Sequence, residues 1–74
     1  MIIPKTKQCI IDLKNRWLTL WFNRPEKRNS LSEILIKEIL KTLDFVEQNS
    51  SIRGVIFRGK GNVFCAGADL KWMH

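Results

Sequence analysis

The apolar positions near the start of the chain predict two strands. In residues 8–14 apolar and polar side chains largely alternate, with Ile10 as the exception, which is typical of a strand with one buried face. Residues 17–23 predict the returning strand, and we expect it to be buried because both of its faces are largely apolar. Asn15-Arg16 lies between them and fits a two-residue hairpin turn.

A longer apolar pattern follows a polar loop around Pro25 and predicts a helix from about residue 31 to residue 48. Ser30 and Ser32 are both suitable N-caps, and the sequence leaves the choice between them open. The apolar stripe of the helix recurs at spacings of one, three and four and consists of Leu35, Ile36, Ile39, Leu40, Leu43 and Val46. Residues 53–59 then predict a strand with a continuous apolar centre, as in parallel sheets.

The order strand, helix, strand predicts an α/β fold with a right-handed crossover between two parallel strands. Their apolar faces must meet in one core, so we expect Leu20, Leu40, Ile56 and Phe57 to pack together. A helix that binds a separate partner is the alternative for the helical stripe. With 74 residues the chain allows one small domain, and no repeat or linker divides it.

The charge of the chain is strongly positive but dispersed. The formal net charge is +6, from 13 Lys and Arg against 7 Asp and Glu. No run reaches five like charges, so a nucleic-acid-binding tail is not predicted. A small nucleic-acid binder that stacks bases on Trp17 and Trp21 is a minor alternative. Arg24, Lys27 and Arg28 form the densest positive patch, which suits phosphate groups, with solvated surface as an equal interpretation.

The cysteines and the N-terminus bear on metal binding, disulfide bonding and cellular location. Cys9 and Cys65 are too isolated for a disulfide framework or a zinc site, so no metal is predicted. Cys65 fits a small packed thiol; a nucleophile there lacks a base, since His74 at the chain end is the sole histidine. Two free thiols, no leader and no apolar run near the roughly 20 residues of a membrane span predict a cytoplasmic protein without membrane contact.

Small residues dominate the end of the chain. Gly59-Lys60-Gly61 lacks the pattern of a phosphate-binding loop and is interpreted as a turn. Residues 64–70 read Phe-Cys-Ala-Gly-Ala-Asp-Leu, and residues 70–73 predict the first turn of a helix. Small residues let a ligand approach the main chain, and unpaired N–H groups at a helix start can hold an oxyanion. A tight turn without a ligand is the alternative.

Two segments together resemble one known family. Residues 23–31, Asn-Arg-Pro-Glu-Lys-Arg-Asn-Ser-Leu, and residues 64–70 are similar in sequence, order and spacing to the crotonase, or enoyl-CoA hydratase/isomerase, superfamily. The resemblance covers about residues 8–74. It implies the N-terminal part of a crotonase (ClpP/crotonase-like) fold, with a β-hairpin, a helix, a parallel strand and the start of a further helix. Residues 1–74 are then a truncated N-terminal portion of an acyl-CoA-binding domain.

The resemblance also implies a site. The residue matching Ala68 donates its backbone N–H to the thioester oxygen, and a second N–H comes from a glycine further along in the family. Its neighbours shape the acyl-CoA channel, and the basic residues of the earlier loop lie along the CoA nucleotide. The implied substrate-binding set is Lys27, Arg28, Ala66, Gly67, Ala68, Asp69 and Leu70.

The implied reaction of the parent enzyme is addition of water to a 2-enoyl-CoA. An enoyl-CoA isomerase, or a non-catalytic remnant that binds acyl-CoA or a partner protein, is the alternative. Hydratases of this family use two later glutamates and isomerases one, and no residue here matches either, so the 74-residue chain is expected to be inactive by itself. Coenzyme A is part of the substrate, so no cofactor is expected, and the parent enzyme is expected to be a homo-oligomer, a trimer or hexamer.

Overall fold

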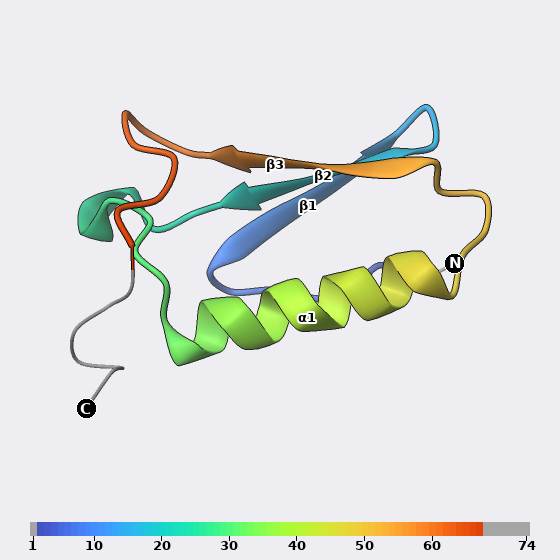
Figure 1. The fold of residues 1–74 in the computed structure, drawn as a ribbon, viewed down its shortest axis with the longest axis horizontal. Helices are drawn as coiled ribbons and strands as arrows, with labels where there is room; N and C mark the ends of the chain where they lie inside the picture. The colour runs from blue at the N-terminus through green and yellow to red at the C-terminus, as the bar shows by residue number, and fades with distance from the viewer. Residues whose placement is uncertain (1, 68–74) are drawn as a thin grey trace.

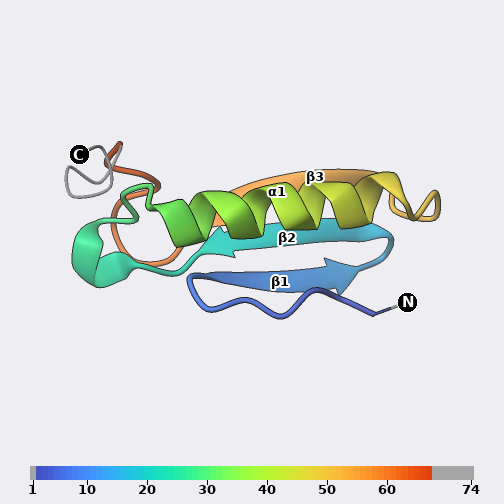
Figure 2. The ribbon, with the colours of Figure 1, turned by 90° about the horizontal axis from the view of Figure 1, so that it is seen from below.

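The computed structural model describes residues 2–67, in which an α-helix lies along one face of a three-stranded sheet (Figure 1). Strand β1 (Cys9–Lys14) pairs antiparallel with β2 (Trp17–Phe22), and β2 pairs parallel with β3 (Gly54–Gly59). The order in the sheet is β1-β2-β3, so β2, one of the two strands predicted to be buried, is the central strand. The chain passes from β2 through a short 3₁₀ helix, η1 (Pro25–Lys27), into α1 (Glu33–Glu47), which runs along the sheet (Figure 2).

The hairpin between β1 and β2 closes through the two residues predicted for it. Asn15 and Arg16 have φ angles of +53° and +68°. Positive φ at both central positions is the signature of a type I′ turn, whose twist matches that of the flanking strands. Lys14 pairs directly with Trp17, so the two-residue hairpin prediction is confirmed.

Helix α1 begins after Ser32, which decides between the two candidate caps. The hydroxyl oxygen of Ser32 accepts a hydrogen bond from the N–H of Leu35 at 3.1 Å and so satisfies one free donor of the first turn. The same hydroxyl donates to the side-chain oxygen of Gln8, which ties the helix start to the segment before β1. At the other end, Asn49 Nδ2 donates to the carbonyl of Phe45 at 2.7 Å, so the helix ends without a glycine.

The core lies between α1 and the face of the sheet beneath it. Leu18 and Leu20 of β2 are fully buried, as is Leu35 of α1. Burying a leucine side chain stabilises a fold by roughly 1.5–3 kcal/mol relative to leaving it exposed. The remaining members of this core are Cys9, Phe22 and Ile52.

The inward face of α1 is rotated from the apolar stripe expected from the sequence. Leu40 and Leu43 of that stripe are 61% and 38% exposed, whereas Thr42 between them is fully buried. The Thr42 hydroxyl donates to the carbonyl of Glu38 at 2.8 Å, which lets a polar side chain face the core. The prediction that Leu40 shares the core with Leu20 is therefore wrong.

Strand β3 is less buried than its apolar sequence suggested. Ile56 pairs with Thr19 and so lies on the face opposite α1, where its side chain is 42% exposed. Phe57 pairs with Leu20 on the α1 side but is 40% exposed, because β3 is an edge strand of the described sheet. The parallel pairing is confirmed, and the placement of Ile56 and Phe57 in the core is wrong.

The carboxylate of Glu38 in α1 holds the segment that precedes β1. Its two oxygens accept hydrogen bonds from the N–H groups of Lys7 at 2.6 Å, Gln8 at 2.8 Å and Cys9 at 3.2 Å. Hydrogen bonds to an ionised acceptor are roughly twice as strong as neutral ones. Glu38 therefore fixes the start of β1 against the helix.

Candidate functional site

Residues 23–31 form a compact loop that leads from β2 into α1. The 3₁₀ helix Pro25–Lys27 begins with a proline, which has no N–H to satisfy at that position. Arg28 and Asn29 both adopt the left-handed conformation, with φ angles of +53° and +56°. A main-chain hydrogen bond of 2.8 Å from Asn29 N to Arg24 O closes the loop.

The side chain of Asn29 joins this loop to the turn after β3. Asn29 is fully buried, and its Oδ1 accepts a hydrogen bond from the N–H of Arg24 at 2.8 Å. Its Nδ2 donates to the carbonyl of Lys60 at 2.8 Å and to that of Val63 at 2.6 Å. One buried amide thus ties together segments that lie more than 30 residues apart in the chain.

The segment after this turn runs alongside the same loop (Figure 1). Ala66 N donates to the carbonyl of Arg28 at 3.0 Å, and Leu31 N donates to the carbonyl of Gly67 at 2.7 Å. Gly67 has a φ of +103°, a conformation that strongly favours glycine. The two segments that carry the family resemblance therefore meet in space through main-chain hydrogen bonds.

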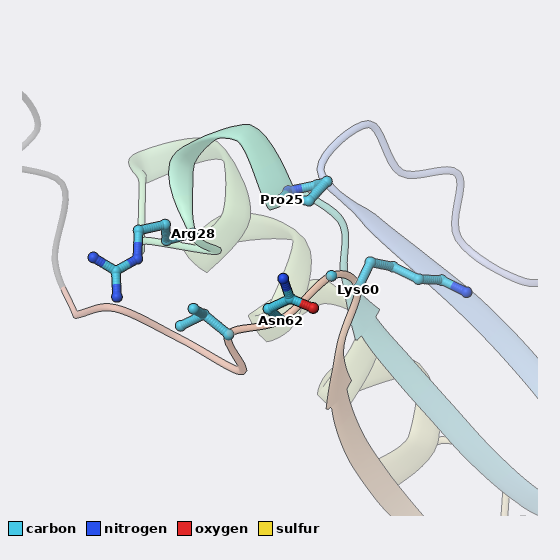
Figure 3. Close-up of a pocket in the computed structure, with 6 residues that line it drawn as sticks. Pro25, Arg28, Lys60 and Asn62 are labelled. Atoms are coloured by element: carbon cyan, nitrogen blue, oxygen red, sulfur yellow. The ribbon is translucent and has the colours of Figure 1, made fainter.

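A hollow of about 310 Å³ lies between η1 and the turn after β3, lined by Pro25, Arg28, Lys60, Gly61, Asn62 and Val63. Figure 3 shows the charged ends of Arg28 and Lys60 pointing to opposite sides. The Lys60 ammonium lies 3.9 Å from the centre of the Trp21 ring. Arg28 is thus the cationic side chain that borders the hollow without a described aromatic partner.

The positive patch predicted in the loop is divided by the fold. Lys27 and Arg28 are exposed, as a phosphate-binding role requires. Arg24 is only 8% exposed, and its guanidinium donates to the carbonyl of Ser30. The prediction of a three-residue surface patch is therefore wrong for Arg24, which stabilises the loop from inside.

An aromatic side chain borders the small-residue segment. Phe64 is 54% exposed, and its ring centre lies 5.1 Å from that of Phe22 in a tilted arrangement. Phe22 in turn lies 6.2 Å from Phe57. The buried Phe22 ring thus lies between those of Phe57 and Phe64. The exposed Phe64 leaves apolar surface next to the place where the two segments meet.

The two cysteines have different surroundings. Burial raises the pKa of the Cys9 thiol from 9.0 to about 11, so Cys9 is an uncharged, weakly reactive thiol at neutral pH. Cys65 is half-buried and packs against the core, in keeping with a small packed thiol. Residues 2–67 contain no group of three His, Cys, Asp or Glu side chains arranged to hold a metal ion, and no helix long and apolar enough to cross a membrane.

The structure brings together four residues of the predicted substrate-binding set. Lys27 and Arg28 lie on the loop, Ala66 and Gly67 lie on the paired segment, and all four are exposed. The other three members, Ala68, Asp69 and Leu70, lie outside the described residues, as does the helix start predicted at residues 70–73.

Comparison with known proteins places the chain in a family. Residues 13–74 match the family model described as enoyl-CoA hydratase/isomerase. The chain belongs to that family. The chain is 46% identical over 50 residues to the human enoyl-CoA hydratase domain-containing protein 2, mitochondrial, and 37% identical over 61 residues to a putative enoyl-CoA hydratase of Thermus thermophilus. These matches cover 66% and 82% of this chain.

The solved structures confirm the fold prediction. An enoyl-CoA hydratase from Mycobacterium tuberculosis H37Rv superposes with a TM-score of 0.85 at 40% identity and covers 90% of this chain. The three-stranded sheet and helix match the N-terminal part of the crotonase fold. The chain spans 17% and 24% of the length of the two relatives named above and 30% of this solved structure.

Sequence reasoning missed two contributions to the site. The motif pattern alone indicates no role for Asn29, although an asparagine tolerates positive φ and offers a donor and an acceptor on one short side chain. The sequence predicts a turn at Lys60, and Lys60 contacts Trp21 of β2 from the position directly after β3. Only the register of β2 and β3 reveals that contact, because Phe22 pairs with Gly59 just before Lys60.

Proposed function

We propose that this chain supplies the acyl-CoA cradle of an enoyl-CoA hydratase, with the backbone N–H of Ala68 as one donor to the thioester oxygen. The observation that carries the proposal is the pairing of Arg28 with Ala66 and of Leu31 with Gly67, at 3.0 and 2.7 Å. It puts a basic, exposed loop directly beside the residue that precedes Ala68. An acyl-CoA has the matching pair of features, with phosphates at one end and a thioester at the other.

The chemistry of the segment supports an oxyanion role. Gly67 is exposed, and a Cβ added to it would meet no atom of residues 2–67 within 4 Å, so these residues leave its main chain open to a ligand. A main-chain N–H aimed at the thioester oxygen stabilises the enolate as charge moves onto that oxygen. Because the donor is a main-chain group, the side chain at position 68 needs only to be small.

Turnover requires groups beyond this cradle. Water must be activated and a proton delivered to the substrate, and in the proposed mechanism glutamates outside residues 1–74 do this. We therefore expect the 74-residue chain to bind acyl-CoA but not to hydrate crotonyl-CoA. Hydration that persists at constant specific activity through further purification would contradict this expectation.

A nucleic-acid ligand is less well supported. Trp21 is flanked by Arg58, 4.8 Å from its ring centre, and Lys60, at 3.9 Å, so these cations lie over the ring that a base would need for stacking. The proposed parent enzyme is a homo-oligomer. A cytoplasmic location is also part of the proposal, although the human relative is named as mitochondrial.

Binding can be tested by titrating the isotope-labelled chain with crotonyl-CoA and following amide chemical shifts. We expect the amides of Gly67 and Ala68 to shift, and Arg28→Ala to weaken binding roughly tenfold through loss of a charge-assisted contact. Arg53→Ala is the matched control, since Arg53 is exposed and precedes β3 at the end of the strand away from the loop. Unchanged amides at saturating ligand, or equal effects of both variants, contradict the proposal.

The Ala68 donor can be tested in a chimera that carries this chain in place of the matching segment of the M. tuberculosis hydratase. Ala68→Pro removes the N–H and should lower turnover by about 10²–10³, the usual loss for one oxyanion donor. Ala68→Gly keeps the N–H and should retain most activity. A folded proline variant with parental turnover shows that Ala68 is not the donor.

A further inference from the structure

The least exposed polar side chain of the candidate site is that of Asn29. It makes three hydrogen bonds, all to main-chain groups, and these use the side-chain oxygen once and the side-chain nitrogen twice. Both Lys60 and Val63, whose carbonyls it binds, belong to the turn that leads directly into the segment 64–67. A fully buried amide with both N–H donors paired costs little to bury, whereas an unmatched replacement leaves main-chain carbonyls unpaired.

The position selects asparagine on two separate grounds. Its φ of +56° disfavours most side chains, and asparagine tolerates this region better than residues with a bulky or branched Cβ. The partners also require one acceptor facing Arg24 N and two donors facing carbonyl oxygens. Aspartate has the same shape and supplies the acceptor but cannot supply both donors.

The main chain around Asn29 is tightly packed on the side of the turn. A Cβ at Gly59 would lie 3.0 Å from Asn29 Nδ2 and 2.7 Å from the carbonyl oxygen of Phe64. Gly59 therefore allows the turn to approach the amide closely. Only Phe64 and Cys65 separate this turn from Ala66 and Gly67, which pair with Arg28 and Leu31.

We propose that Asn29 is a positioning residue: its side-chain amide sets the path of residues 60–67 and thereby the place of the Ala68 N–H. The placement of the Ala68 N–H rests on the function proposed above. The hydrogen bonding of the Asn29 amide to Lys60 and Val63, called the clamp below, does not. Asn29 touches no reacting atom. Two N–H donors on one planar amide fix the turn, and the turn fixes the paired strip of main chain that precedes Ala68.

The test uses two substitutions at one position and a matched control elsewhere. Asn29→Asp removes both donors and turns a carboxylate toward the carbonyls of Lys60 and Val63. Asn29→Gly removes the whole side chain but accepts the positive φ. Asn15→Asp makes the same chemical change at another left-handed residue, which lies exposed in the hairpin turn.

Amide hydrogen exchange of the free 74-residue chain tests the clamp without any ligand. We expect the amides of Ala66 and Leu31 to exchange about tenfold faster or more in Asn29→Asp and Asn29→Gly, with the β1–β2 amides unchanged. Asn29→Asp should have at least as large an effect as Asn29→Gly, because the carboxylate faces two carbonyl oxygens. A purely space-filling role predicts the reverse order, and that order, or parental exchange in both variants, overturns the proposal.

The unsubstituted chain gives a second reading that does not depend on the variants folding. The side-chain NH₂ protons of Asn29 should exchange more slowly than those of the exposed Asn62, because both protons of the Asn29 amide are hydrogen-bonded in the interior. Equal rates for the two side chains overturn the clamp.

A spectroscopic reading with crotonyl-CoA separates this inference from the proposed function. If the parental chain binds and its Ala68 amide shifts, Asn29→Asp should lose most of that shift while Asn15→Asp keeps it. A parental chain that shows no shift contradicts the proposed function, and the exchange experiment still decides the clamp. An Asn29→Asp chain with faster exchange but an unchanged Ala68 shift overturns the positioning role.

Discussion

The two faces of the central strand β2 both carry large apolar side chains, but the burial of the sheet differs greatly between its two faces. On the face under α1, Leu18 and Leu20 are fully buried and Phe22 is 6% exposed. On the opposite face, Trp17 and Ile56 are more than 40% exposed. The strand β2 contributes apolar side chains to both faces, but α1 covers only the first. The opposite face also carries the polar residues Asp12, Thr19 and Arg58 of the three strands.

Apolar residues persist on the uncovered face because other groups of the chain lie against them. There the indole of Trp21 is covered by two cations, with Arg58 at 4.8 Å and Lys60 at 3.9 Å from its ring centre. The Trp17 ring lies over Gly54, where an added Cβ would come within 2.4 Å of it. Long basic side chains thus shield the Trp21 ring, and the absence of a side chain at Gly54 lets the Trp17 ring pack on the main chain.

The largest expected contrast is between truncations on the two faces. Leu20→Ala leaves a cavity in the covered core and should lower the free energy of unfolding by about 2–5 kcal/mol. Ile56→Ala, on the opposite face, should cost about 1 kcal/mol or less. Urea unfolding followed by circular dichroism measures both. Similar losses for the two variants indicate that the outer face is covered in solution, by a partner or a second copy.

The covered face should also respond to pH through Cys9. Burial raises its pKa from 9.0 to about 11, against an opposing contribution from Thr6 and with a smaller raising contribution from the Glu38 carboxylate, so the folded state holds this proton more tightly than the unfolded one. The stabilisation is complete below pH 9 and is lost as the pH rises toward 11, by about 2–3 kcal/mol.

Cys9→Ala is the control for this titration, since the lysines that also titrate there are common to both proteins. The free energy of unfolding of the parent should fall more steeply between pH 9 and 11 than that of the variant. Parallel curves show that the Cys9 thiol is not protected in solution.

The stability of α1, which covers one face of the sheet, depends on its N-terminal cap. Ser32→Ala removes the acceptor for Leu35 N and the donor to Gln8, and should lower the free energy of unfolding by about 1 kcal/mol. Ser30→Ala is the matched control, because α1 uses Ser32 and not Ser30 as its cap. If Ser30→Ala costs more in thermal or urea unfolding, the helix begins earlier in solution than in the structure.

The smallest expected effect is on the uncovered face. Arg58→Ala removes one of the two cations near Trp21 and should cost about 0.5–1 kcal/mol, as expected for exposed cation–π pairs. Its tryptophan fluorescence should shift toward the red as water reaches the indole. Arg53→Ala makes the same change of charge away from the ring, and a red shift of equal size there contradicts the contact.

Local patterns predicted the elements of the fold better than their burial. The hairpin at Asn15-Arg16 and a serine cap at the helix start depend on neighbouring residues, and so are visible in sequence, although only the structure chooses Ser32 over Ser30 as the cap. Whether Thr42 or Leu40 faces the sheet depends on the rotation of α1, which the hydrogen bond of Thr42 to Glu38 permits and which apolar spacing does not reveal. The exposure of Phe57 depends on which strand lies at the edge, and that follows from pairing rather than composition.

The candidate site divides in a similar way. Lys27, Arg28, Ala66 and Gly67 could be named because they lie within two recognisable motifs. That the motifs pair through main-chain bonds could not be derived from the residues, since the N–H and carbonyl groups involved are common to nearly all residue types. The burial of Arg24 was also hidden, because a loop arginine is ordinarily a surface residue.

The order β1-β2-β3 has a consequence for how the sheet assembles. The β1–β2 ladder closes through two residues, and hairpins of this kind form on a timescale of about 1–10 μs. The β2–β3 ladder must wait until residues 23–53 are arranged, because closing that long connection costs chain entropy before any parallel pairing offsets it. The paired strip at Arg28 and Leu31 depends on the turn after β3, so the region proposed to hold substrate is expected to be the last part of the chain to take shape.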